Sequence, residues 1–74
     1  MGKLRVLSGT GVCGILARHG FVEVRRRGSH IVMQRTDSEG TTTVPVPDHR
    51  EVHMGTLRSI IRQSGLSRSD FETP

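Results

Sequence analysis

The chain has 74 residues, including 11 Lys or Arg and 7 Asp or Glu, so it carries a net charge of +4 with neutral histidines. This size predicts a single domain over residues 1–74, with one helical layer on one sheet layer, and the basic excess favours polyanionic partners. The single cysteine excludes an internal disulfide and a multi-cysteine zinc site, and it fits a reducing compartment.

The amino end, residues 1–7, shows no strong pattern, and we expect it to be flexible or only partly ordered. It is too short and too polar for the apolar region of a signal peptide. No apolar run approaches the roughly 20 residues that span a bilayer. We therefore expect a cytoplasmic protein that does not enter a membrane.

A first helix is predicted from about Gly9 to His19, with Ser8 as its N-cap. Gly20 stands where a left-handed C-terminal cap belongs. Glycines inside the helix weaken it, so it depends on tertiary packing. One helical face is formed by residues spaced i, i+3, i+4 and i+7, namely Val12, Ile15, Leu16 and His19.

Three strands are predicted next, at Phe21–Arg27, His30–Arg35 and Thr41–Val46, with Gly28-Ser29 as the first turn. Pro45 and Pro47 suggest that the third strand ends the ladder or lies at an edge. Each strand carries one apolar pair, and we expect the three pairs to form the buried face of an antiparallel meander. The pairs are Val22/Val24, Ile31/Met33 and Val44/Val46. Strand alternation then places Glu23, Arg25, His30 and Val32 on the opposite face.

A second helix is predicted from Met54 or Thr56 to Ser64, with an apolar stripe of Leu57, Ile60 and Ile61 and a cap at Gly65. Leu66 can fold back onto the core, and the segment from Ser67 to Asp70 can start a last turn that carries Phe71. The predicted fold class is therefore α+β, in the order helix, three-stranded antiparallel sheet, helix. One sheet face would be covered and the other open, as in double-stranded-RNA-binding domains.

The stretch from Arg25 to His30 holds the candidate chemistry. Arginine offers a planar charged fork that suits phosphate, and histidine exchanges a proton near neutral pH. We hypothesise that this hairpin binds a phosphodiester, RNA above all, through Arg25, Arg26, Arg27 and Ser29, with His30 as the proton-transfer group. The alternative is a solvated arginine face, an ordinary turn serine and a polar strand histidine. The two phenylalanines are the only aromatic residues, which excludes an aromatic platform for stacking bases.

The other candidate site residues are histidines and the lone cysteine. His49 and His53 are four residues apart, a spacing that a helix could aim at zinc, but Pro47 and Gly55 disfavour a helix there. We predict no metal and no cofactor, and we expect His49 to help bind RNA near the end of the sheet. His19 is predicted to be structural, and Cys13 to be a small buried residue rather than a nucleophile.

Four segments in order resemble the HicA (YcfA-like) toxin family of bacterial toxin–antitoxin systems, and the resemblance covers about Ser8 to Phe71. The segments are Gly20-Phe21, Arg26-Arg27-Gly28-Ser29-His30, Val44-Pro45-Val46-Pro47-Asp48-His49 and Gly55-Thr56-Leu57-Arg58-Ser59-Ile60. The resemblance implies an α-β-β-β-α fold, ribosome-independent cleavage of mRNA, and a HicB-type antitoxin as partner. It also implies that His30 is the catalytic histidine. The chain departs from the family at Gly11 and Gly14 and, where a lysine is frequent, at His53.

Two functions from different classes follow. The first is a metal-independent endoribonuclease toxin restrained by an antitoxin. The second is a non-catalytic RNA-binding module that uses the same basic sheet face. The sequence leaves the oligomeric state open.

Overall fold

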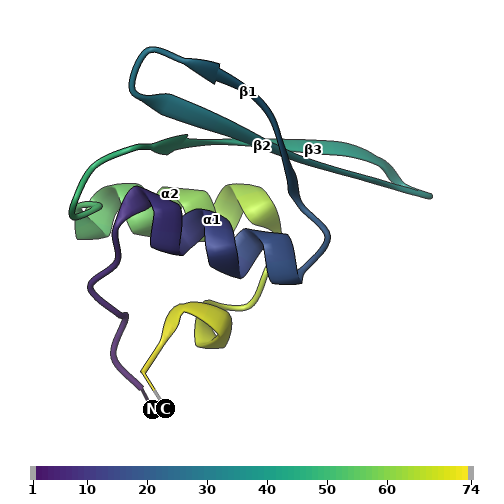
Figure 1. The fold of residues 1–74 in the computed structure, drawn as a ribbon. Coiled ribbons are helices and arrows are strands. Elements are labelled where there is room, and N and C mark those ends of the chain that lie inside the picture. The colour runs from purple at the N-terminus through teal and green to yellow at the C-terminus, as the bar shows by residue number, and fades with distance from the viewer. Residues whose placement is uncertain (1, 74) are drawn as a thin grey trace.

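The computed structural model, which describes residues 2–73, has the expected α-β-β-β-α order and one open three-stranded sheet (Figure 1). Both helices pack beneath the sheet, and none of the described elements covers its upper face. The strands are antiparallel in the order β1-β2-β3, so β1 and β3 are the edges. The elements are α1 Gly9–Arg18, β1 Val22–Arg27, β2 His30–Asp37, β3 Gly40–Pro47, α2 Met54–Ser64 and the short 3-10 helix η1 Arg68–Phe71.

The helix ends lie where the capping residues predict them. The Ser8 hydroxyl accepts a hydrogen bond from the Gly11 amide at 3.0 Å, which satisfies one free amide of the first turn of α1. α2 ends at Ser64, and the following Gly65 has a φ of 73°, the left-handed conformation of a C-terminal cap. Gly20, with a φ of 90°, makes the same kind of turn between α1 and β1.

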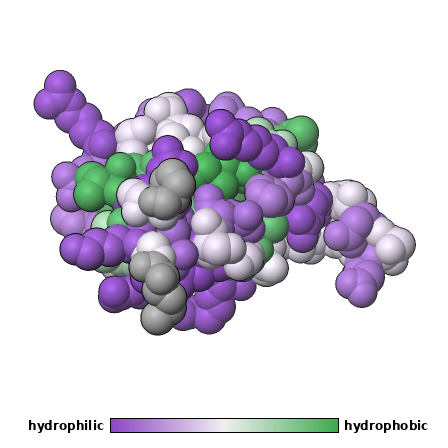
Figure 2. All heavy atoms as spheres, turned by 90° about the horizontal axis from the view of Figure 1, so that it is seen from below, coloured by the Kyte–Doolittle hydropathy of each residue, from purple (hydrophilic) through white to green (hydrophobic). Residues whose placement is uncertain are grey.

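The core lies between the helices and the lower face of the sheet. Apolar residues of α1 and α2 meet the β2 and β3 residues that the alternation assigned to this face, and Leu66 packs against them as expected. Seen from below, hydrophobic residues form a band among hydrophilic ones (Figure 2). The largest fully buried side chains are Phe21, Phe71, Leu16, Ile31, Leu57 and Ile60.

The prediction for the first strand was wrong at Val22 and Val24. Both side chains are exposed, at 60% and 46%, and every residue of β1 is exposed. A β-bulge between Glu23 and Arg25 shifts the register, so Glu23 lies opposite buried Met33 and shares its face, against expectation. The apolar contribution of this region to the core comes instead from Phe21, which lies just before the strand.

The amino-terminal segment, for which we expected at most partial order, is hydrogen-bonded to the carboxyl-terminal segment through Lys3 and Arg5. The Arg5 amide donates to the Phe71 carbonyl at 2.9 Å and the Thr73 amide to the Lys3 carbonyl at 2.8 Å. Figure 1 shows the first and last described segments converging below the helices. None of the helices within residues 2–73 is long and apolar enough to cross a membrane.

Candidate functional site

The open face of the sheet carries His30 at one end, where β2 begins. His30 lies opposite Arg27 on β1 and opposite Pro47 on β3. The next row on the same face is Arg25, Val32 and Pro45. Directly opposite residues on antiparallel strands share a face, with their Cβ atoms about 4.5–5.5 Å apart. Arg27 on β1 therefore lies beside His30 on β2, and Arg25 lies beside Val32, the next residue of β2 on the same face.

A shallow groove of about 350 Å³ runs over these rows. Val32 forms its buried floor, with 7% of its surface exposed. Arg25 and Arg27 are exposed and make no ion pair with any residue in the described part of the chain. Their guanidiniums are thus available for an anion. The groove is lined by Arg25, Arg27, His30, Val32, Thr43 and Pro45.

Arg26 lies on the other face of β1 and is already paired. Its Nη1 is 2.5 Å from Oδ2 of Asp48, and this hydrogen bond raises the pKa of the Arg26 guanidinium. The three consecutive arginines therefore separate into two that border the groove and one that holds the segment after β3. Ser29 joins the same connection through its backbone, since its carbonyl accepts a hydrogen bond from the Asp48 amide at 2.6 Å.

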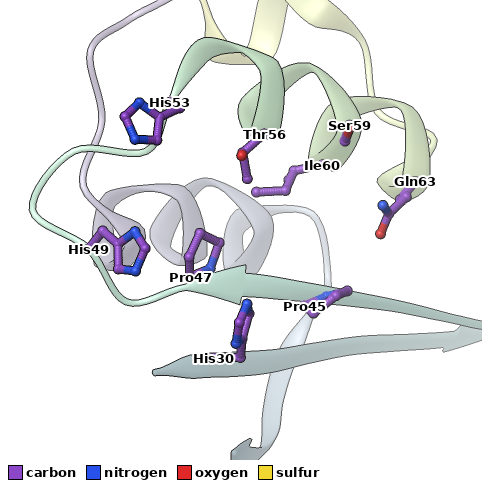
Figure 3. A pocket seen from close by; sticks show the side chains of 9 residues that line it. All are labelled: His30, Pro45, Pro47, His49, His53, Thr56, Ser59, Ile60 and Gln63. Carbon is purple, nitrogen blue, oxygen red and sulfur yellow. The ribbon is translucent and has the colours of Figure 1, made fainter. Parts of the chain in front are cut away.

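A second cavity, of about 330 Å³, adjoins His30 between β3 and α2. Figure 3 shows His30 rising from β2, His49 in the connection after β3, and His53 at the start of α2. α2 contributes polar side chains along one side, at Thr56, Ser59 and Gln63. His30 therefore borders both depressions, whereas His49 borders only this one.

The backbone around His49 is fixed by the start of α1. The Gly9 amide donates to the His49 carbonyl at 2.8 Å. A Cβ at position 9 would lie 2.1 Å from the Pro47 carbonyl oxygen, so only glycine allows this close approach. The connection that carries His49 is consequently tied to α1, to Arg26 and to the turn before His30.

The expected absence of a helix through His49 agrees with the structure, because α2 begins at Met54. His49 and His53 therefore do not share a helical face. Among residues 2–73, no group of three His, Cys, Asp or Glu side chains is arranged as a metal-ligand set.

Cys13 and His19 lie outside both depressions. Cys13 is half-buried, and burial, followed by the charges of Glu23 and Asp48, raises the pKa of its thiol, which makes the thiolate scarcer. His19 Nε2 is 3.5 Å from Oδ1 of Asp70, a contact between the end of α1 and η1. This contact gives His19 the structural surroundings that were expected.

Sequence reasoning missed the α2 side of the site. Thr56, Ser59 and Gln63 follow the spacing i, i+3, i+7, which does predict one helical side. The apolar stripe of α2 also predicted which side packs on the sheet. The missing information was that this polar side meets the edge of β3 next to His30, which depends on how distant segments pack.

Comparison with known proteins adds a family. No curated protein matches the chain. A family model described as HicA toxin of bacterial toxin-antitoxin matches residues 9–66. This range includes every residue that lines the two depressions.

Proposed function

The chain belongs to the HicA toxin family of bacterial toxin–antitoxin systems, and we propose that it is an endoribonuclease that cleaves mRNA without a ribosome and without a metal ion. A toxin of such a system has an antitoxin partner. Its toxicity, in this proposal, comes from the open sheet face around His30.

The observation that carries the proposal is the position of His30 between the two depressions. Arg27 lies directly across from it and Arg25 one row further along the same face. A phosphodiester bound by these two guanidiniums would lie within the width of one strand of the imidazole. The two arginines can form charge-assisted hydrogen bonds to the phosphate, and His30 places a proton-transfer group beside them.

RNA brings its own nucleophile to such a site, because the ribose 2′-hydroxyl can attack the adjacent phosphorus. His30 would move a proton to or from the reacting oxygens. Arg25 and Arg27 would offset the negative charge that develops on the phosphoryl oxygens. The reaction therefore requires no metal and no covalent intermediate with the protein.

The test is incubation of the purified chain with structured and unstructured RNA in excess chelator. We expect fragments that end in a 2′,3′-cyclic phosphate and a 5′-hydroxyl, and we expect the His30→Ala variant, purified in parallel, to form them about 100-fold more slowly or worse. An intact RNA whose electrophoretic mobility is shifted would instead support the non-catalytic RNA-binding module. Equal cleavage by the His30→Ala variant would place the activity elsewhere.

We further propose that the antitoxin is of the HicB type and covers the open face. That face offers Arg25 and Arg27, which make no ion pair within residues 2–73, and the exposed side chain of Val22 at the other end of β1, so an acidic surface with an apolar patch at one end would complement it. Hydrogen exchange of residues 25–34 should slow in the saturated complex. Unchanged exchange there would place the partner on another surface.

A further inference from the structure

We propose that His49 is the second proton-transfer group of the RNA-cleaving site and works across the β3–α2 cavity from His30. The inference rests on the proposed endoribonuclease function and extends it. Three histidines border one cavity of about 330 Å³: His30 at the start of β2, His49 in the connection after β3, and His53 just before α2 (Figure 3).

The proton balance of the reaction is the reason to look for a second group. One imidazole, in its neutral form, takes the proton of the 2′-hydroxyl as the bond from O2′ to phosphorus forms. The bond from phosphorus to O5′ then breaks, and an imidazolium gives O5′ a proton. The products are a 2′,3′-cyclic phosphate and a 5′-hydroxyl, and no other reactant is consumed. Two histidines in opposite protonation states can carry out both transfers in one passage.

The fold holds the two histidines in a fixed relation. Pro47 pairs with His30 across the β2–β3 ladder, so His49 follows only two residues later. The Asp48 amide is bonded to the Ser29 carbonyl at 2.6 Å, which joins the residues immediately before each histidine. Arg26 holds the Asp48 carboxylate, and the Gly9 amide holds the His49 carbonyl at 2.8 Å. These contacts involve the backbone and neighbouring side chains, and the His49 side chain itself is exposed, so it can reach a ligand.

The rest of the cavity offers one competitor. Hydroxyl and amide side chains of α2 do not exchange protons readily at neutral pH, which leaves His53. His53 is six residues beyond the position opposite His30 and has no side-chain hydrogen bond at the N-terminus of α2. The described backbone contacts join Asp48 to the turn before His30 and His49 to Gly9 of α1, whereas the His53 carbonyl accepts from the Leu57 amide within α2.

Several titratable or charged groups lie near His49. His30 and His53 face it across the cavity. Asp48 precedes it and is neutralised by Arg26, while Arg50 and Glu51 follow it in the same connection with opposite charges. Gly9, the α1 residue that contacts this connection, has no side chain to titrate.

The first experiment measures the pH dependence of single-turnover cleavage in chelator for the wild type and for variants with one histidine replaced. We expect a bell-shaped profile for the wild type, because one histidine must be neutral and the other protonated. His30→Ala and His49→Ala should each lose about 100-fold or more in rate, and the two variants should lose opposite limbs of the bell. His19→Ala, which removes a histidine outside both depressions, should keep the full profile.

The second experiment assigns the two roles with an RNA whose scissile 5′-oxygen is replaced by sulfur. A thiolate leaves without being protonated, so this substrate should restore cleavage to the variant that lacks the general acid and not to the variant that lacks the general base. We expect one of His30→Ala and His49→Ala to be rescued and the other to remain slow. Rescue of both or of neither would overturn the pairing.

Melting curves for all variants distinguish a loss of cleavage caused by unfolding from one caused by the missing imidazole. The known backbone contact of His49 is through its carbonyl, so His49→Ala should fold; if it does not, His49→Asn replaces it in both experiments. If the wild type cleaves RNA and the His49→Ala variant cleaves it at the same rate, the inference is overturned and the proposed function stands. Loss of a limb in His53→Ala but not in His49→Ala would transfer the role to His53. A wild type that binds RNA without cleaving it would overturn the proposed function and the inference together.

Discussion

The two faces of the sheet have opposite compositions although they share the same strands. The lower face sets Ile31 and Met33 of β2 against the helices, both at most 3% exposed. The upper face sets His30 beside Arg27, with Arg25 in the next row. Because consecutive residues alternate between the faces, the groups that hold the fold and the proposed groups of the chemistry are separated by one position. Neighbouring substitutions should therefore have unrelated consequences.

The largest effect is expected from a pair of neighbours at the start of β1. Phe21 is 1% exposed and Val22 is 60% exposed. Phe21→Ala should lower the free energy of unfolding by about 3–5 kcal/mol, the usual cost of emptying a phenylalanine site. Val22→Ala should change it by no more than about 0.5 kcal/mol. Urea unfolding at equilibrium measures both, and a comparable loss for Val22→Ala would contradict the position of the bulge.

A second comparison separates the consecutive arginines by face. RNA affinity should fall steeply with salt, with a slope of about −0.7 for each phosphate neutralised on a single strand. Arg25→Gln and Arg27→Gln should each reduce that slope by about 0.7. Arg26→Gln should reduce it less, because Asp48 already holds this guanidinium. Titration of RNA binding at several salt concentrations decides the point, and equal losses for all three variants would show that the ion pair opens on binding.

The smallest effect concerns Cys13, on the helix side. Burial raises the pKa of this thiol in the folded chain, so its neutral form is favoured there. The associated stabilisation is present below the pKa of the unfolded thiol and is lost as pH rises through the higher folded value. Alkylation by iodoacetamide should accelerate at a higher pH in the native chain than in denaturant. The same pH midpoint in both states would mean that the thiol is not shielded.

The comparison of the faces also shows what the sequence could predict. Capping residues and apolar spacing predicted both helices, because Ser8, Gly65 and the stripe containing Leu57 act locally. Ile31, Met33, Val44 and Val46 predicted the buried face of β2 and β3, because those strands pair in unbroken register. β1 could not be predicted in the same way, since one extra residue at the bulge reverses the alternation before it.

The candidate site was predictable to a similar extent. Local residue types indicated His30 and the arginines, and the structure places Arg25 and Arg27 beside His30 on one face. The separation of Arg26 toward Asp48 depends on a contact between residues 22 positions apart. The cavity between His30, His49 and α2 requires β3, its connection and α2 to be packed together. Interactions of this range leave no periodic pattern in the sequence.

The most direct test of the division between the two faces compares His30→Ala with Ile31→Ala. Each variant needs an unfolding curve and a cleavage rate per folded molecule from the same preparation. His30→Ala should unfold within about 0.5 kcal/mol of the wild type and cleave about 100-fold more slowly or worse. Ile31→Ala, at a position that is 2% exposed, should lose about 2–5 kcal/mol of stability and keep its rate per folded molecule. An unfolded His30→Ala, or an Ile31→Ala that is stable but slow, would contradict the assignment of chemistry to the open face.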